Sequence, residues 1–242
     1  MDKQQVIFKD LGIVEYKTAW DYQEKLLGEN VAIKSKARGE GKNDVMTELP
    51  TKNYLLFCEH NPVYTLGNSG NINNVLLSDD ELKKNGIDFF RTNRGGDITF
   101  HGLQQIVGYP IIDLEKFYTD IGKYLRNLEE AVILTIAEYG ITGERSTGET
   151  GVWIDAGIPG KARKICAIGV RCSRWITMHG FALNVNTDLS YFNNIIPCGI
   201  QGKQVTSMEK ECKHSIDYGE VKQKLKKNFE KVFDIELIPD RY

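Results

Sequence analysis

Cysteine is scarce in this sequence, and neither sign of charge dominates it. The chain has 242 residues, of which only 5 are cysteines, an odd number that is too low for a disulfide framework. Lysine and arginine together number 31 and aspartate and glutamate 33, so the formal net charge is −2. A chain without a basic excess has no strong field to hold a phosphate backbone. These shortages indicate reduced thiols and argue against nucleic acid as a partner.

The sequence also lacks a long hydrophobic run and a targeting segment. An uncharged run near the middle, Ala131 to Ala137, is enclosed by Glu130 and Glu138 and is far short of the roughly 20 apolar residues that cross a bilayer. The N-terminal residues MDKQQVIFKDLG contain acidic side chains and no apolar core, unlike a signal or transit peptide. We therefore expect a soluble, cytoplasmic protein with no membrane partner.

Motifs for metals and nucleotides are missing as well. Neither C-x-x-C nor H-E-x-x-H occurs, and the closest pairs, Cys58 with His60 and Cys166 with Cys172, do not have a standard zinc spacing. The sequence GKA at 160–162 lacks the remaining residues of a P-loop, and no G-x-G-x-x-G is present. We predict neither a metal nor a bound cofactor.

The hydrophobic pattern predicts strands and helices without strict alternation. Helices are expected around 16–31, at Ser78 to Asn85 with a capping box from Ser78 and Glu81, over Asp120 to Tyr139 with Gly140 as C-cap, and around 221–233. Strands are expected at 6–14, 54–59, 63–66, 87–92, 97–100, 105–112, 151–155, 164–172 and 176–186. Strands interrupted by a few helices favour an α+β layer fold, with a mixed and mostly antiparallel sheet flanked by helices. No internal repeat is evident, so we expect a single domain over 1–242, with a charged, mobile surface segment at about 34–52.

One cysteine stands in an unusual context. In the sequence PCG (197–199), proline fixes the backbone before Cys198 and glycine permits an unusual turn after it. That geometry presents a side chain as a nucleophile requires, although Pro-Cys-Gly is equally consistent with a plain tight turn. A nucleophilic thiol needs a nearby cation or base, and the candidates are His101, His179 and Lys164. Lys164 begins the apolar strand KICAIGV, where it could accept a proton or simply extend its amine to solvent.

Two further segments suggest a ligand site. In the strand HGFALNVN (179–186), glycine, alanine and asparagine point to one face and larger apolar residues to the other. That face either forms a groove for a slender apolar ligand or makes way for a packed helix. The segment RGGDITFHG (94–102) combines paired glycines with arginine, threonine and histidine donors. It is either a place where backbone approaches a ligand or a hairpin turn.

Four segments, in this order and spacing, closely resemble the lipoyl(octanoyl) transferases: RGGDITFHG (94–102), KICAIGV (164–170), HGFALNV (179–185) and PCG (197–199). The likeness extends to LGIVEYKTAWDYQ near the start, EHNPVYTLG (59–67) and QVTSM (204–208), so it covers nearly the whole chain outside 34–52. The resemblance implies the single-domain catalytic fold that this family shares with biotin and lipoate protein ligases.

The resemblance also implies an activity, partners and a site. The family transfers an octanoyl group, without a cofactor, from octanoyl-acyl carrier protein to a lysine of lipoyl domains, the first step of endogenous protein lipoylation. The acceptors would be the lipoyl domains of 2-oxoacid dehydrogenase complexes and the glycine cleavage H protein. Carried over by motif, Cys198 would be the acyl-thioester nucleophile, and Lys164 would activate it and then handle the proton of the amine. The acyl site would be lined by Arg94, Gly95, Gly96, Asp97, Ile98, Thr99, Phe100, His101, Ala167, Ile168, Gly169, Gly180, Phe181 and Ala182.

Two departures from the family pattern and three alternatives accompany this interpretation. The sequence has Leu103-Gln104-Gln105 where the family usually continues HG with Pro-Gly-Gln, which is expected to reshape the loop after His101. The charged stretch at 34–52 is longer than typical. A lipoyl amidotransferase would use the same cysteine chemistry with a different donor. An ATP-dependent lipoate or biotin ligase would share the fold and form an adenylate, and a non-catalytic binding module would tolerate loss of Cys198.

Overall fold

The computed structural model describes residues 3–40, 47–196 and 204–240. Its strands are β1 (Gln4–Ile13), β2 (Tyr54–Glu59), β3 (Val63–Leu66), β4 (Asp88–Arg91), β5 (Ile98–His101), β6 (Gln105–Ile111), β7 (Glu144–Ser146), β8 (Glu149–Ile154), β9 (Arg163–Ser173), β10 (Ile176–Asn184), β11 (Gln204–Val205) and β12 (Ile235–Pro239). Its α-helices are α1 (Tyr16–Gly39), α2 (Asp79–Lys84), α3 (Ile121–Ala137), α4 (Met208–Cys212) and α5 (Tyr218–Phe233), and short 3₁₀ helices are η2 (Ile72–Asn74), η3 (Leu114–Lys116) and η4 (Leu189–Asn194).

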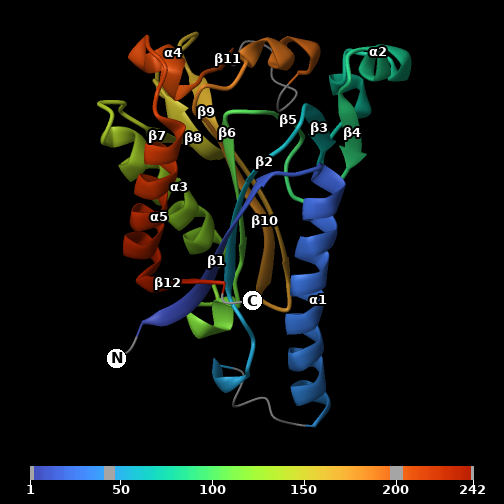
Figure 1. Cartoon of the computed structure of the whole chain (residues 1–242), viewed down its shortest axis with the longest axis vertical. Helices are drawn as coiled ribbons and strands as arrows, with labels where there is room; N and C mark the ends of the chain where they lie inside the picture. Colours follow the sequence, from blue (N-terminus) through green and yellow to red (C-terminus); the bar gives the residue numbers. More distant parts are fainter. Residues whose placement is uncertain (1–2, 41–46, 197–203, 241–242) are drawn as a thin grey trace.

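The described strands form two sheets (Figure 1). The large sheet has the order β12-β1-β2-β6-β10-β9-β8-β7, with β11 paired to β9, and the small sheet has the order β4-β3-β5. In the large sheet β1 runs parallel to both β12 and β2, and β11 runs parallel to β9. The other pairs of that sheet are antiparallel. The predicted α+β class, with a mixed and mostly antiparallel sheet, is confirmed.

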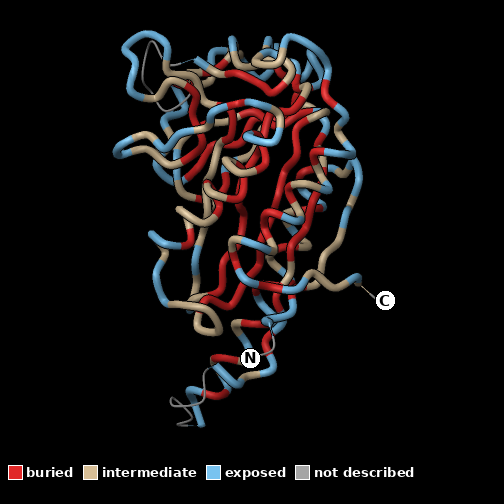
Figure 2. The backbone as a smooth tube through the Cα atoms, turned by 90° about the vertical axis from the view of Figure 1, so that its left-hand side faces the viewer, coloured by how far each residue is buried: buried red, intermediate tan, exposed pale blue. Residues whose placement is uncertain are grey.

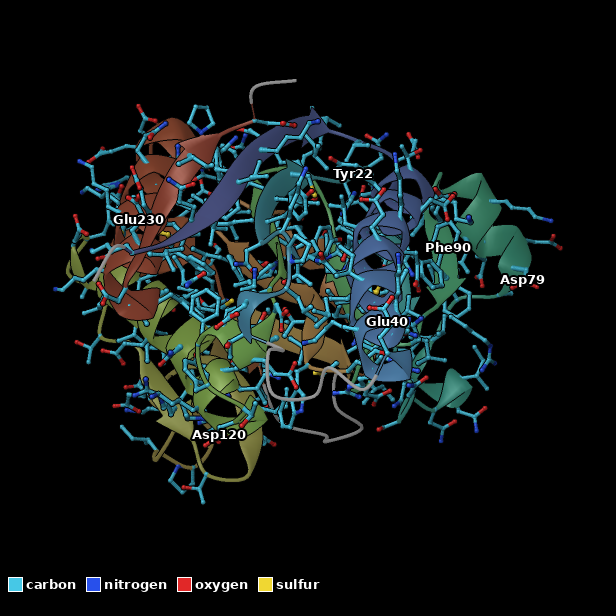
Figure 3. The ribbon with its side chains drawn as sticks, turned by 90° about the horizontal axis from the view of Figure 1, so that it is seen from below. Tyr22, Glu40, Asp79, Phe90, Asp120 and Glu230 are labelled. Atoms are coloured by element: carbon cyan, nitrogen blue, oxygen red, sulfur yellow. The ribbon has the colours of Figure 1, made fainter. Side chains whose placement is uncertain are left out.

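Helices cover both faces of the large sheet. Helices α3 and α5 pack on one face through Leu128 and Phe229, whereas α1 packs on the other face, against β6 and β10, through Leu26. Figure 3, seen from below, shows α1 with Tyr22 and α5 with Glu230 on opposite sides of the sheet. The strands between them are the most buried part of the chain (Figure 2). This layered arrangement is the usual way for a sheet to bury both of its apolar faces.

Side chains cap the helices where the sequence predicts. Ser78 accepts a hydrogen bond from the Glu81 N–H, and Glu81 accepts one from the Ser78 N–H at 2.8 Å, so the capping box of α2 is confirmed. The Asp120 carboxylate accepts from the Lys123 N–H at 2.9 Å and begins α3. Helix α3 ends at Ala137 with Glu138 as its C-cap, so it is shorter than predicted, and Gly140 lies two residues beyond this cap. Gly140 has a φ of +75°, a left-handed conformation that glycine adopts without strain.

Helix α1 continues further than its hydrophobic pattern predicts. The predicted surface segment at 34–52 therefore begins too early, because residues 34–39 are helical. Lys34 is fully buried, and its ammonium lies 2.5 Å from Asp113 Oδ1 and 2.6 Å from Glu115 Oε2. The Thr51 hydroxyl donates to Asp113 Oδ2 at 2.7 Å. These ion pairs allow a charged residue to face the interior and continue the helix.

Three strands were not predicted, namely β7, β11 and β12. The two residues of β11 pair with β9. The short β7 pairs with β8, and β12 follows directly after α5 and pairs with β1 at the other end of the chain. Among the described residues, no helix combines the length and apolar character needed to cross a membrane.

Candidate active site

A cavity of about 510 Å³ lies between the two sheets and the start of α3, within the usual range for small-molecule sites. It contains ten of the predicted site residues: Gly95, Gly96, Asp97, Ile98, Thr99, Lys164, Ala167, Ile168, Gly169 and Ala182. It is also lined by residues that were not predicted, namely Gln105, Ile121, Leu125, Glu149, Thr150, Trp153, Val170, Asn184, Phe192, Gln204 and Val205. Segments far apart in the sequence therefore converge on one space.

Lys164 is the cationic residue of this lining. It lies on β9, and its Nζ is 4.5 Å from the centroid of the Trp153 ring, a cation–π distance. Gly151 lets β8 approach β9 closely beside the lysine, because a Cβ there would lie 2.7 Å from Cys166 O. The indole of Trp153 thus contacts the amine at the wall of the cavity.

A polar clasp holds β11 beside Lys164. The Thr206 N–H donates to Lys164 O at 3.0 Å, and the Thr206 hydroxyl donates to Glu211 Oε1 at 2.5 Å. Arg163, the neighbour of Lys164, donates to both oxygens of the Glu211 carboxylate at 2.6 Å. A bidentate arginine–carboxylate pair fixes direction as well as distance. Strand β11 is thus fastened to β9 at the level of Lys164.

Cys198, the predicted nucleophile, lies outside the described residues. The described residues on either side of its segment are anchored by backbone hydrogen bonds. The Ile196 N–H donates to Asn74 O at 2.8 Å, and the Gln204 N–H donates to Ala162 O at 3.3 Å. The chain therefore re-enters the described structure at β11, next to Lys164.

The segment 94–99 forms one wall of the cavity. The Gly95 N–H donates to Val170 O at 2.9 Å and thereby ties this segment to β9. The Arg94 guanidinium is buried and donates to Thr65 O at 2.6 Å and to Thr65 Oγ1 at 2.9 Å. The Asp97 carboxylate accepts from the side-chain amide of Asn74 at 2.6 Å. The two charged side chains of this segment are therefore used to hold its backbone in place.

The floor of the cavity is made of small residues from two paired strands. Ala167 stands opposite Ala182, and Gly169 stands opposite Gly180, in the register of β9 and β10. A Cβ at Gly169 would lie 2.7 Å from Gly95 O, so the close approach of the 94–99 segment requires glycine here. The predicted alternation of β10 is confirmed, because Phe181, Leu183 and Val185 belong to the core on the α3 side.

Four more predicted site residues, Arg94, His101, Gly180 and Phe181, border a second, much smaller cavity of about 20 Å³, which Ala167, Gly169 and Ala182 also line. The described linings of the two cavities do not include Phe100, which instead stacks on Tyr191 with ring centroids 4.6 Å apart. The Phe181 ring packs over Gly108 and against Phe57, in the core of the large sheet.

Three hydrogen bonds link the buried side chain of His101 to the backbone of Thr206, the residue that holds β11 beside β9. His101 Nδ1 pairs with Gln105 Oε1 at 2.9 Å, and Gln105 Nε2 donates to Asn184 Oδ1 at 2.8 Å. The Asn184 amide in turn donates to Thr206 O at 3.0 Å. Gln105 and Asn184 were not predicted as site residues. Asn184 was detectable, because it shares the groove face of its strand with Gly180 and Ala182.

The other unpredicted lining residues carried weaker signals. Trp153 belongs to an apolar strand, where a tryptophan is ordinarily part of the core. Ile121 and Leu125 follow the same helical stripe as the core residues of α3, so periodicity alone cannot separate them.

Burial removes the histidines from the list of candidate bases. The pKa of His179 is lowered to about 3 by burial and by the nearby Arg94 and Arg171. Burial, with help from His60 and Arg94, holds the pKa of His101 well below its usual value. Both rings are therefore neutral at pH 7 and supply no positive charge to a thiolate. Of the three candidates named from the sequence, Lys164 is the one that lines the main cavity.

Gln104 shows how the departure from Pro-Gly after His101 is accommodated. It has a φ of +60°, a left-handed conformation that costs a non-glycine residue about 1–2 kcal/mol. Its N–H donates to Glu59 Oε2 at 2.6 Å, and its carbonyl oxygen accepts from the Thr187 hydroxyl at 3.0 Å. These bonds hold the turn without glycine.

Across the ranges that the structure describes, no group of three or more histidine, cysteine, aspartate or glutamate side chains is arranged to hold a metal ion.

Comparison with known proteins decides the family. Residues 15–230 match the lipoyl protein ligase A/B catalytic domain. The chain belongs to this family. An octanoyltransferase of Christiangramia forsetii is 60% identical over 235 residues, which cover 97% of this chain and 98% of the relative. An octanoyltransferase of Flavobacterium psychrophilum is 58% identical over 231 residues, covering 95% and 97%. The resemblance seen in the sequence motifs is confirmed.

Solved structures of family members share the fold. A bipartite lipoate protein ligase of Thermoplasma acidophilum superposes with a TM-score of 0.70 at 18% identity, covering 98% of this chain and 87% of that chain. A lipoate-protein ligase A bound with ATP superposes with a TM-score of 0.67 at 18% identity, covering 99% and 89%. At this identity the likeness concerns the fold alone, and it confirms the predicted catalytic-domain architecture.

Proposed function

We propose that this protein transfers an octanoyl group from octanoyl-acyl carrier protein to a specific lysine of lipoyl domains, through a thioester on Cys198. The acceptors are the lipoyl domains of 2-oxoacid dehydrogenase complexes and the glycine cleavage H protein. Octanoyl transfer itself is supported by curated octanoyltransferases that are 56–60% identical over nearly the whole chain. The donor, the thioester and the acceptors are the parts that experiment must test.

The observation that carries the proposal is the position of Lys164. It lines a largely apolar cavity and lies beside β11, the strand that follows the Cys198 segment. A thiol near an ammonium group loses its proton more readily, because the cation stabilises the thiolate. The apolar walls from Ile98, Ile168 and Val170 suit an alkyl chain that extends away from the reacting carbonyl.

The proposed reaction has two steps. The Cys198 thiolate attacks the thioester carbonyl of the donor, a C–S bond forms to the enzyme, the donor's C–S bond breaks, and the carrier's thiol leaves with a proton from the Lys164 ammonium. The acceptor lysine then attacks the acyl-enzyme carbonyl, the enzyme C–S bond breaks, and an amide forms. A lysine amine has a pKa near 10.4 and is mostly protonated at pH 7, so a base must remove its protons. The acceptor ammonium first loses one proton to solvent. Lys164, left neutral by the first step, then takes a second proton from the attacking amine and gives it to the departing Cys198 sulfur.

The decisive experiment is intact-protein mass spectrometry after mixing the enzyme with octanoyl-acyl carrier protein without ATP. We expect a mass increase of one octanoyl group on the wild type that hydroxylamine removes and that Cys198→Ala lacks. Cys166→Ala is the matched control, because burial raises the pKa of the Cys166 thiol, and this thiol is expected to stay unacylated. Transfer by Cys198→Ala, or an adduct that survives hydroxylamine, would refute the thioester.

Two further arms separate the alternatives. Octanoylated glycine cleavage H protein, offered as the donor in place of the carrier protein, tests for an amidotransferase. Free octanoate with ATP tests for a ligase, which would release pyrophosphate. We expect the carrier protein to be the preferred donor in both comparisons.

A further inference from the structure

A fully buried carboxylate on α3 is joined to β8, the strand that lies beside Lys164. The Glu129 side chain is 0% exposed. Its Oε1 accepts from the Gly151 N–H at 3.0 Å, and its Oε2 lies 2.8 Å from Arg126 and 3.2 Å from Arg145. An apolar side chain fills a core at lower cost than a paired carboxylate. The distinctive contribution of Glu129 is therefore its hydrogen bond to Gly151.

Gly151 stands where β8 departs from regular pairing on both of its sides. Against β9 the pairing shifts by one residue just after Val152, at the point where Trp153 faces Lys164. Against β7 the register shifts as well. Such bulges interrupt the backbone ladder and change the direction of a side chain. At this irregular point the Gly151 N–H donates to the Glu129 carboxylate, an acceptor outside the sheet.

The same glycine lies beside the stem of Lys164. A Cβ at Gly151 would lie 3.5 Å from Lys164 Cε and 2.7 Å from Cys166 O, so the side chain and the backbone of β9 both pass close to it. Gly151 has a φ of +126°, a conformation that residues with a side chain rarely adopt. Two residues farther along β8, the centroid of the Trp153 ring lies 4.5 Å from Lys164 Nζ. A shift of β8 at Gly151 would therefore move two surfaces against which the lysine side chain lies.

We propose that Glu129 is a positioning residue that holds Gly151, and through it Lys164, in place for acyl transfer. This inference rests on the proposed function, in which Lys164 exchanges protons with the reacting groups. Arg126 and Arg145 give the buried carboxylate the compensation that it requires. Their side chains are 42% and 37% exposed, so both guanidinium groups can turn to water when Glu129 is replaced. The loss of Glu129 therefore acts mainly on Gly151.

The test compares three variants of α3. Glu129→Leu removes the acceptor of the Gly151 N–H, whereas Glu129→Gln keeps an amide oxygen, which accepts a weaker hydrogen bond than a carboxylate. Glu130→Leu is the matched control, because the neighbouring Glu130 also contacts Arg145, at 2.5 Å, and is 38% exposed. Circular dichroism and melting temperature establish that each variant folds.

Three quantities are measured in each variant: the rate constant of octanoyl-enzyme formation from octanoyl-acyl carrier protein, the dissociation constant of free octanoate, and the rate at which acetic anhydride labels Lys164 relative to the exposed Lys17. In Glu129→Leu the rate constant should fall at least about tenfold, because small misplacements of a reacting group are this costly. The dissociation constant should change by a smaller factor, because Glu129 does not line the cavity. Labelling of Lys164 should rise several-fold, because its amine is no longer sheltered by the indole.

The other two variants show whether the hydrogen bond to Gly151 is responsible. In Glu129→Gln the changes in rate constant and labelling should be present but smaller than in Glu129→Leu. In Glu130→Leu all three quantities should equal those of the wild type. A graded response at Glu129, without a response at Glu130, does not follow from the loss of ion pairs on the surface of α3.

The outcomes separate this inference from the proposed function. Labelling of Lys164 at the wild-type rate in Glu129→Leu would overturn the inference, even where all variants transfer octanoyl groups. A rate constant and a dissociation constant that change by the same factor would overturn it as well, and so would an equal response in Glu130→Leu. If Glu129→Leu does not fold, Glu129→Gln decides by the same criteria. If labelling changes as expected but the wild type forms no adduct with octanoyl-acyl carrier protein, the role of Glu129 in placing Lys164 stands and the proposed function fails.

Discussion

Replacing Gly169 by alanine should disrupt the cavity, because the new methyl group would meet backbone. A Cβ at Gly169 would lie 2.7 Å from Gly95 O and 3.3 Å from Arg94 Cδ. Favourable carbon–oxygen contacts begin at about 3.3 Å, so the 94–99 segment would have to move by about half an ångström. That displacement strains the hydrogen bond from the Gly95 N–H to Val170 O, now 2.9 Å. Overpacking of this kind costs about 1–3 kcal/mol.

The expected result for Gly169→Ala is a melting temperature about 2–10 °C lower and a kcat/KM for octanoyl transfer reduced at least about tenfold, since small misplacements of a substrate-binding wall are costly. Differential scanning calorimetry and transfer kinetics measure these effects. Gly28→Ala is the control, because a Cβ on this exposed α1 residue would meet no atom within 4 Å, and alanine should stabilise the helix by about 1 kcal/mol. A Gly169→Ala enzyme with wild-type melting and kinetics would refute the reasoning.

Three other predictions concern stability. Lys34→Met leaves the buried Asp113 carboxylate without its ammonium partner and should lower the free energy of unfolding by about 3–5 kcal/mol in urea titrations; a loss below about 1 kcal/mol would contradict the role of this pair. Burial lowers the pKa of His60 to about 4, below its value of 6.5 in an unfolded chain, so between these pH values the unfolded state binds more protons. Stability should therefore fall by at least about 2 kcal/mol from pH 7 to pH 4.5, and His60→Gln should flatten this dependence. Thr206→Val removes the hydroxyl that donates to Glu211 and should lower the free energy of unfolding by about 1.5–3 kcal/mol. The rate of acyl-enzyme formation should fall more than the affinity for substrate. Equal effects on the rate and the affinity would show that these bonds do not position the reacting groups.

Local signals predicted much of the fold. The apolar stripe of α3, the capping box of α2 and the alternation of β10 each depend on neighbours within a few residues, and all three are observed. The end of α1 was missed because Lys34 is buried through ion pairs with Asp113, which is 79 positions away in the sequence, and with Glu115. Strand β12 was missed for a similar reason, since five residues after a helix become a strand only by pairing with β1 at the start of the chain.

The candidate site, like the fold, was predicted where the sequence signal is local and missed where a contact depends on distant residues. Sequence motifs placed Lys164 and the small residues of the floor, because their chemistry or size is unusual for a strand. They could not place Gln105 against Asn184, which is also 79 positions away, or Ile121 of α3, which differs from a core residue only in facing the cavity. Long-range pairing, rather than local pattern, determines these contacts.

Strand β9 explains why one motif can serve both chemistry and binding. Strand β8 pairs with β9 only over Arg163–Cys166, and farther along the 94–99 segment hydrogen-bonds to β9 instead, at Val170. The part of β9 that is paired with β8 and β11 carries Lys164. The part beyond it contributes Ala167 and Gly169, whose small size exposes backbone to the ligand. Changes near Lys164 should therefore act mainly on kcat, and changes at the floor mainly on the binding and length of the acyl chain.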